Sequence, residues 1–192
     1  MTTGHAPTLK DCSPHVGGEP IRVGDYTVYA GGTWHLTAEV ASEFDVLVSL
    51  NGDLPKGFNP MDGLLNGYRL DFGDVVELDG LRILGAAIPD YQGPPPGWRE
   101  FLEQRVIPEL EAGRKVLAFC SAGHGRTGTF LASLVALLER RGETPDPVFA
   151  VRQRHCCEAV ETMDQVEAVF ALRGEAAPKR YLTSVRDTPY RL

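Results

Sequence analysis

A thiol and a guanidinium lie six positions apart in the stretch CSAGHGRTG, which begins at Cys120 and contains Arg126. Apolar runs enclose it, KVLAF before and TFLASLVALL after, and these predict a strand and a helix. A glycine-rich turn between a strand and a helix directs backbone N–H groups at an anion, and arginine adds a forked donor for phosphoryl oxygens. We therefore predict a phosphate-binding loop. The residues expected to bind phosphate are Ser121, Ala122, Gly123, His124, Gly125 and Arg126.

Cys120, at the start of this loop, is a candidate nucleophile. Cationic groups and a helix N-terminus favour the ionised form of a cysteine, so the sequence predicts a thiolate at neutral pH. A thiolate in a phosphate site can attack phosphorus, while loop amides and Arg126 stabilise the charge on the equatorial oxygens. A Walker-type nucleotide loop is excluded, because it needs a lysine after its final glycine and this loop has none.

The oxygen that leaves phosphorus needs a proton, and a positioned carboxylic acid that supplies it contributes roughly 10²–10⁴ in rate. Asp90 in AIPDYQGPPPG is the candidate, because it follows the apolar run LRILGAAI and lies 30 residues before Cys120. The carboxyl ends of parallel strands meet at one edge of a sheet, which would bring these two residues together. Asp74 and Asp79 are poorer candidates, since no buried strand directs them to that edge.

Strands alternate with helices along the chain. Three apolar runs of strand length, FDVLVSLNG, LRILGAAI and KVLAF, are typical of buried parallel strands. Helical spacing of apolar residues is present in WREFLEQRVIPELEAG, TGTFLASLVALLERRG, PDPVFAVRQR and TMDQVEAVFALRG. The alternation predicts an α/β domain with a central, mainly parallel sheet flanked by helices.

Local signals add further expectations. RVGDYTVYAGG is expected to form one strand, and Thr33 to cap a short helix. Residues 51–80 are rich in Gly, Asp, Asn and Pro, which predicts a long excursion with a short strand at DVVEL. Pro108 should kink the last turn of its helix, and Arg140 and Arg141 suit the C-terminal dipole of the long helix before them.

The segment CSAGHGRT resembles the Cys-x5-Arg-Ser/Thr signature of the protein tyrosine phosphatase superfamily, most closely its small dual-specificity and single-domain members. The resemblance implies the cysteine-phosphatase fold, a phosphocysteine intermediate, and neither a metal nor another cofactor. It assigns Cys120 as the nucleophile, Arg126 as the phosphate ligand and Thr127 as a hydroxyl that hydrogen-bonds the thiolate. The loop of Asp90 resembles the acid loop of the family. Gln165 occupies the place of the glutamine that orients the hydrolytic water.

The sequence departs from the family pattern at two points. Most members have a histidine before the nucleophile that helps to order the loop, and Phe119 stands there instead, which predicts a thiol that ionises less readily. The loop also lacks the lysines typical of members that act on polyphosphorylated inositol lipids. That absence argues against such a substrate.

Several functions remain compatible with these residues. The leading hypothesis is a phosphatase that acts on phosphotyrosine, and also on phosphoserine or phosphothreonine, in proteins. A second hypothesis keeps the chemistry with a nucleotide, an RNA 5′ end, a phosphoinositide or a sugar phosphate as substrate. A non-catalytic phosphate-binding module is a third. The joint presence of Cys120, Arg126, Thr127 and Asp90 argues against the third.

The chain has 192 residues and a net charge of −7, which suits one domain and argues against a nucleic-acid or anionic-membrane surface. No secretory signal or membrane-spanning run is visible, and the four cysteines lack framework spacing. We therefore expect a cytoplasmic protein with free thiols, whose partner is a phosphorylated protein or a small phosphoester. Cys156 or Cys157 could protect Cys120 through a reversible disulfide, although such cysteines more often pack in the core. The expected organisation is a loose N-terminal arm (1–20), a single phosphatase domain (21–175) and a C-terminal tail (176–192).

Overall fold

The computed structural model of the chain describes residues 9–10, 12, 15, 18–34, 36–55, 69–78, 80–183 and 185. Six strands of these residues form one sheet in the order β1-β2-β6-β3-β5-β4. The strands β2, β6, β3 and β5 are parallel, and the edge strands β1 and β4 are antiparallel to their neighbours. The strands are β1 (Glu19–Val23), β2 (Tyr26–Gly32), β3 (Val46–Ser49), β4 (Val75–Leu78), β5 (Leu81–Gly85) and β6 (Val116–Cys120). The predicted mainly parallel sheet is confirmed.

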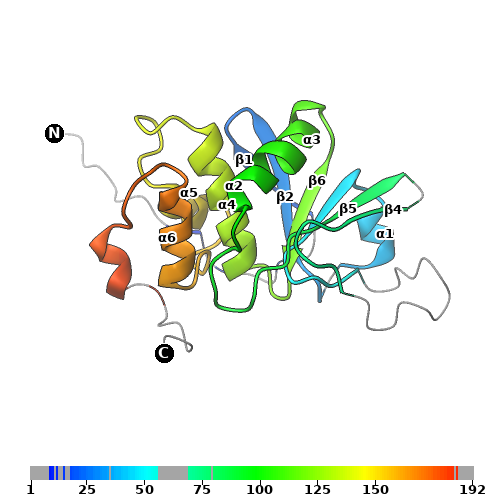
Figure 1. Ribbon diagram of the computed structural model, residues 1–192, viewed down its shortest axis with the longest axis horizontal. Helices are drawn as coiled ribbons and strands as arrows, with labels where there is room; N and C mark the ends of the chain where they lie inside the picture. The colour runs from blue at the N-terminus through cyan, green and yellow to red at the C-terminus, as the bar shows by residue number, and fades with distance from the viewer. Residues whose placement is uncertain are drawn as a thin grey trace.

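Helices cover both faces of this sheet (Figure 1). The helices α2, α3 and α4 cover one face, α5 and α6 pack against α4 on the same side, and α1 packs on the other face. The longest described helix, α4, begins directly after the loop that follows β6. The helices are α1 (Ala38–Ala41), α2 (Trp98–Phe101), α3 (Ile107–Glu111), α4 (Gly125–Leu138), α5 (Pro147–Arg154) and α6 (Met163–Ala171). The predicted α/β class is confirmed.

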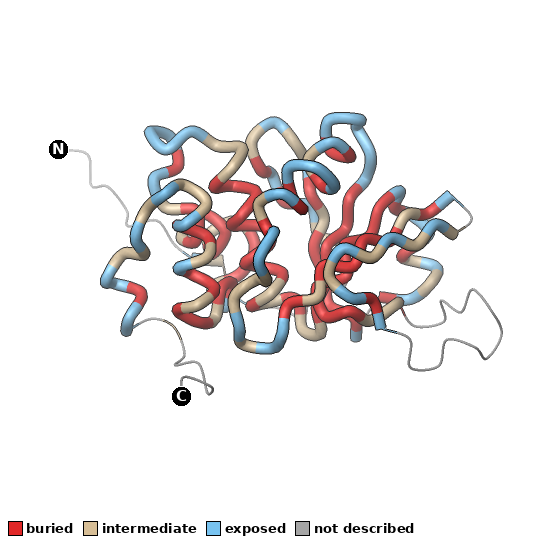
Figure 2. Tube along the Cα trace, viewed as in Figure 1, coloured by how far each residue is buried: buried red, intermediate tan, exposed pale blue. Residues whose placement is uncertain are grey.

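The central strand β6 shows why its sequence is apolar throughout. Successive side chains of a strand point to opposite faces. Ala118 and Cys120 belong to the core beneath α4, whereas Leu117 and Phe119 belong to the smaller core beneath α1. Figure 2 shows the central strands as buried segments between the helical layers. Because both faces are covered, every position of β6 is buried, and the thiol of Cys120 faces the layer in which α4 begins.

The segment at the start of the sheet differs from the expectation. RVGDYTVYAGG was predicted as one strand, but it forms the antiparallel hairpin of β1 and β2. The chain reverses at Gly24, whose φ of +55° suits glycine. The prediction that Thr33 caps the short helix is wrong, because α1 begins about one turn later. The cap is Thr37, whose hydroxyl accepts the N–H of Val40 at 3.3 Å.

Two helices differ in detail from the expectation. The helix expected over 98–113 is present as continuous helical backbone, formed by α2, a π-helical turn (Leu102–Val106) and α3. The π turn lies just before Pro108, which has no N–H to donate into a regular helix, so the irregularity precedes the expected kink. The long helix α4 ends at Leu138, so Arg140 and Arg141 lie beyond its last turn and do not act on its dipole as expected.

Residues near the two termini contact this fold. In the segment 1–20, the N–H of Lys10 donates to the carbonyl of Arg152 at 3.1 Å, and His15 is 3% exposed. In the segment 176–192, a 3₁₀ helix (Lys179–Thr183) buries Tyr181, whose hydroxyl bonds to Asp146. Residues 56–68 of the excursion, and Asp79, lie outside the described residues, and β4 matches the strand expected at DVVEL. No helix of the described part of the chain has the length and hydropathy to cross a membrane.

Candidate active site

The loop 120–126 joins β6 to α4 at the edge where the parallel strands end. Its path requires glycine at two nearby positions. Gly123 has a φ of +87°, and a Cβ there would lie 2.9 Å from the Cβ of His15. A Cβ on Gly128, in the first turn of α4, would lie 2.7 Å from the backbone nitrogen of Val160. These glycines let the loop turn tightly and let α4 approach the segment before α6.

The sulfur of Cys120 lies beneath this loop. Cys120 is the last residue of β6 and is 3% exposed. The backbone N–H of Gly123 donates to its Sγ at 3.2 Å. An amide donor and the N-terminal end of α4 both favour negative charge on this sulfur. The structure therefore places a thiol where the loop amides and an adjacent helix end can stabilise its anion.

Arg126 and Asp90 meet although they come from different loops. Arg126 lies in the first turn of α4, and its Nη2 is 3.1 Å from Oδ1 of Asp90 and 3.1 Å from Oγ of Ser121. Its Nη1 donates to the carbonyl of Ile88 at 3.5 Å. The side chain of Arg126 is 11% exposed and that of Asp90 is 63% exposed. The carboxylate thus lies at the surface above a nearly buried guanidinium.

The loop that carries Asp90 follows β5, whose end lies at the same edge of the sheet as the end of β6. The chain turns sharply at Tyr91, a non-glycine residue with a φ of 59°. A Cβ on Gly93 would lie 2.9 Å from the carbonyl oxygen of Asp164, so this loop packs closely on the start of α6. This close packing fixes the position of the Asp90 loop relative to α6.

Thr127 and Gln165 are both fully buried. Among the described residues, the hydroxyl of Thr127 and the Nε2 of Gln165 have no hydrogen-bond partner. The Oε1 of Gln165 accepts the N–H of Glu161 at 2.8 Å. The carboxylate of Glu161 in turn packs on Gly125 of the loop, so closely that a Cβ on Gly125 would overlap its Oε2. Gln165 is therefore connected to the loop through Glu161, and the contacts of its side chain do not place it against Cys120.

The peptide of Cys120 is held by a buried polar network. Both the N–H and the hydroxyl of Thr33 donate to the carbonyl of Cys120, at 2.7 and 2.8 Å. The Nδ2 of Asn51 lies 3.0 Å from Oγ1 of Thr33 and 3.3 Å from Oγ of Ser121. Phe119, by contrast, is fully buried in the apolar core on the opposite face of the sheet. The loop is thus ordered from β2 and β3 without a histidine at position 119.

A second contact holds the middle of the loop. The Nε2 of His155 donates to the carbonyl of Gly123 at 2.7 Å. Burial lowers the pKa of His155 to about 4, so the ring is neutral near pH 7 with its proton on Nε2. His124, the N-cap of α4, has its Nδ1 3.5 Å from the Sγ of Cys156. Burial raises the pKa of Cys156 to about 12, which makes it a poor second nucleophile.

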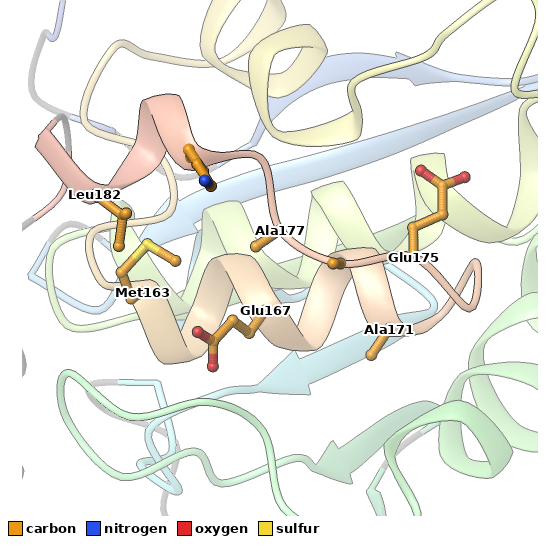
Figure 3. A pocket seen from close by; sticks show the side chains of 8 residues that line it. Met163, Glu167, Ala171, Glu175, Ala177 and Leu182 are labelled. Carbon is orange, nitrogen blue, oxygen red and sulfur yellow. The ribbon is translucent and has the colours of Figure 1, made fainter.

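Two hollows of similar size lie in this part of the molecule, one near the loop 120–126 and one near α6. The first, of about 420 Å³, lies beside Arg126 and Asp90 and is also lined by Asn51, Arg69 and Ile88. The second, of about 440 Å³, lies between α6 and the C-terminal segment, where Met163 and Leu182 approach each other (Figure 3). No residue of the loop 120–126 lines the second hollow. The first is therefore the one that adjoins the candidate site.

Comparisons with known proteins were made for sequence and for structure. No protein-family model matches the chain. Two uncharacterized proteins of Methanocaldococcus jannaschii are similar in sequence. MJECL20 is 35% identical over 83 residues, 43% of this chain and 54% of that protein. MJ0215 is 40% identical over 71 residues, 37% of this chain and 40% of that protein. The matches thus span about half or less of these relatives.

Solved structures of phosphatases are similar over most of their length. Tk-PTP in its active form has a TM-score of 0.56 at 23% identity, over 81% of this chain and 97% of that chain. The chain has the protein tyrosine phosphatase fold. Kinase associated phosphatase, with its catalytic-site cysteine replaced by serine, has a TM-score of 0.58 at 16% identity, over 85% of this chain and 97% of that chain. PTPMT1 has a TM-score of 0.53 at 15% identity, over 81% of this chain and 94% of that chain.

Several residues that hold the loop are not indicated by the sequence. Thr33 is expected there to cap a helix, and neither Asn51 nor His155 carries a signal that links it to the loop. Each acts through a contact across 18 or more residues. The chain contains no local pattern that announces such contacts. Only the sheet topology, which places β2 and β3 on either side of β6, indicates where partners must come from.

Replacement of Thr33 by the isosteric valine tests the buried network. Thr33→Val should lower the free energy of unfolding by about 1–3 kcal/mol, because the buried carbonyl of Cys120 and amide of Asn51 each lose a bond. Urea denaturation measures this change. Thr27→Val, at an exposed position of β2, the strand that precedes Thr33, is the matched control and should change stability by less than about 0.5 kcal/mol. Equal effects of the two substitutions would contradict the proposed role of the network.

Proposed function

We propose that this protein is a cysteine-dependent phosphatase that hydrolyses phosphomonoesters, with phosphotyrosine in proteins as the main substrate. The observation that carries the proposal is the convergence of three groups from two loops. The thiol of Cys120 lies beneath a loop amide at 3.2 Å, and the guanidinium of Arg126 lies 3.1 Å from the carboxylate of Asp90. A nucleophile, an anion ligand and a proton donor are the groups that phosphoryl transfer to sulfur requires.

The first step transfers the phosphoryl group from the ester oxygen to Cys120. The loop amides and Arg126 bind the phosphoryl oxygens, and the phosphoryl group replaces the carboxylate of Asp90 as the partner of the guanidinium. The thiolate of Cys120 attacks phosphorus as the bond from phosphorus to the ester oxygen breaks. Asp90 protonates the leaving oxygen, and the alcohol or phenol departs.

The second step hydrolyses the phosphocysteine. A water molecule attacks phosphorus, Asp90 accepts its proton, and the bond from phosphorus to sulfur breaks to release inorganic phosphate. The hydroxyl of Thr127 stabilises the departing thiolate, and the amide of Gln165 orients the water. The buried hydroxyl of Thr127 and the Nε2 of Gln165, which have no partner among the described residues, support these two roles.

The surroundings of the loop favour a phosphoprotein over a polyphosphorylated lipid. PTPMT1 has been crystallised with PI(5)P, but the loop of this chain contains no lysine and the chain carries a net charge of −7. The hollow beside Arg126 contains acidic as well as basic side chains, Asp71 and Asp90 with Arg69. A reducing compartment such as the cytoplasm suits the proposal, because the nucleophilic thiol must stay reduced.

Asp90→Asn tests the acid. It should lower kcat for an aryl phosphate by about 10²–10⁴-fold with little change in KM, because Cys120 and Arg126 still bind the phosphoryl group. The loss should be larger for phenyl phosphate than for 4-nitrophenyl phosphate, whose leaving group needs less protonation. Steady-state kinetics on both substrates measures this difference.

Two variants serve as controls for the Asp90→Asn measurement. Asp25→Asn, in the turn between β1 and β2 with a fully exposed side chain, should leave kcat unchanged. Cys120→Ser should abolish turnover and set the background. An unchanged kcat in Asp90→Asn, on both substrates, would remove Asp90 from the mechanism.

The substrate class is tested by a panel of phosphotyrosine and phosphoserine peptides, nucleoside monophosphates, sugar phosphates and phosphoinositides. The phosphotyrosine peptides should give the highest kcat/KM, and orthovanadate should inhibit their hydrolysis. Release of inorganic phosphate is the readout. A higher kcat/KM for a nucleotide, sugar phosphate or phosphoinositide would contradict the phosphoprotein assignment while leaving the cysteine chemistry intact.

A further inference from the structure

Four potential metal ligands meet on the side of the loop that carries His124. They are Cys12, His15, His124 and Cys156, whose ligand atoms all lie within 4.8 Å of one another. They come from three parts of the chain: the segment before β1, the phosphate-binding loop and the segment after α5. Only the pair Cys12 and His15 is close in sequence, so the cluster has no visible metal-binding motif.

Two of the separations between these atoms match those expected around a tetrahedral zinc ion. Zinc bonds sulfur at about 2.3 Å and imidazole nitrogen at about 2.0–2.1 Å, so two ligands of a tetrahedron lie about 3.6 Å apart. The Nδ1 of His124 lies 3.6 Å from the Sγ of Cys12 and 3.5 Å from the Sγ of Cys156. Ordinary packing of thiols and imidazoles does not require all four atoms to gather around one point.

His15 gives an independent indication of a ligand. Its side chain is 1% exposed, and its Nε2 has no hydrogen-bond partner among the described residues. A buried imidazole without a partner is unfavourable. Its Nδ1 lies 3.5 Å from Oε2 of Glu19, a carboxylate placed to orient the ring, which leaves Nε2 as the ligand atom. A metal ion would satisfy this buried nitrogen.

We propose that Cys12, His15, His124 and Cys156 form a structural zinc site that fastens the N-terminal segment to the phosphate-binding loop. Zinc displaces one proton from each thiol, and two thiolates with two neutral imidazoles neutralise its charge. Four protein ligands leave no open position, so the ion holds structure and takes no part in phosphoryl transfer. Because Cys12 is exposed, the metal can enter from solvent.

The proposal places a constraint on the loop itself. His124 is the N-cap of α4 and precedes Gly125 and Arg126. A zinc ion bound to its ring would fix the start of α4, at the opposite end of the loop from Cys120, which Thr33 holds. Without the metal, the described side chains that hold the loop from other segments include Thr33, Asn51 and His155.

Metal analysis of the reduced, full-length protein, purified with zinc present, tests the proposal. It should contain about one zinc per chain. Cys12→Ser and Cys156→Ser should each lose most of it, and Cys157→Ser, the neighbouring thiol outside the cluster, should retain it. Because Cys12 is exposed, its replacement does not disturb the core, so loss of zinc there is not a folding defect. Glu19→Gln should weaken zinc binding about 10–100-fold by releasing His15.

Substitution of cobalt for zinc supplies a second readout. Wild-type and Cys157→Ser proteins should show thiolate-to-cobalt charge-transfer absorption, and it should be weaker in Cys12→Ser and Cys156→Ser. A reduced wild-type protein that binds no zinc would overturn the proposal. This holds even if the protein before reduction contains a disulfide between Cys12 and Cys156. Equal loss of zinc from Cys157→Ser and Cys156→Ser would also overturn it. These measurements do not depend on phosphatase activity, so they stand apart from the proposed function.

Discussion

The proposed phosphate site requires the loop between β6 and α4 to keep its amide hydrogens directed at one point, and the secondary structure of the loop itself cannot do this. Its backbone is fixed from other segments instead. Thr33, the residue after β2, holds the carbonyl of Cys120, and His155 holds the carbonyl of Gly123 from the segment after α5. An anion site built from amides loses strength when those amides can rotate, so the proposed phosphate site depends on these contacts as well as on the loop glycines.

The sheet order explains how these contacts arise. Because β6 lies between β2 and β3, residues that follow both neighbours reach the loop, as Thr33 and Asn51 do. The next strand outward, β5, delivers the loop of Asp90 to the same edge. The carboxylate of Asp90 lies at the surface and the guanidinium of Arg126 is nearly buried. This difference suits their proposed roles, in which Asp90 approaches and leaves the substrate and Arg126 stays in place.

Much of this arrangement could be predicted from sequence, because its signals are local. The apolar runs define β3, β5 and β6, and the glycines define the loop. Because parallel strands end at one edge of a sheet, the sequence also predicts that Cys120 and Asp90 lie close together. The hairpin at Gly24, the cap at Thr37 and the π turn before Pro108 are local features with ambiguous signals, since either Thr33 or Thr37 could cap a helix and a glycine can end a strand or turn a hairpin. The contacts of Thr33, Asn51 and His155 around the loop depend on tertiary packing, and so does the cluster around His124, which joins residues 112 positions apart.

The central claim is that the sulfur of Cys120 receives the phosphoryl group. Rapid acid quenching during turnover of an aryl phosphate, followed by mass spectrometry of the digested protein, tests it most directly. The account predicts one phosphoryl group on the peptide that contains Cys120, visible in the presteady state and absent after the substrate is exhausted. Steady turnover with no phosphorylated peptide, or with the phosphoryl group on another residue, would contradict it.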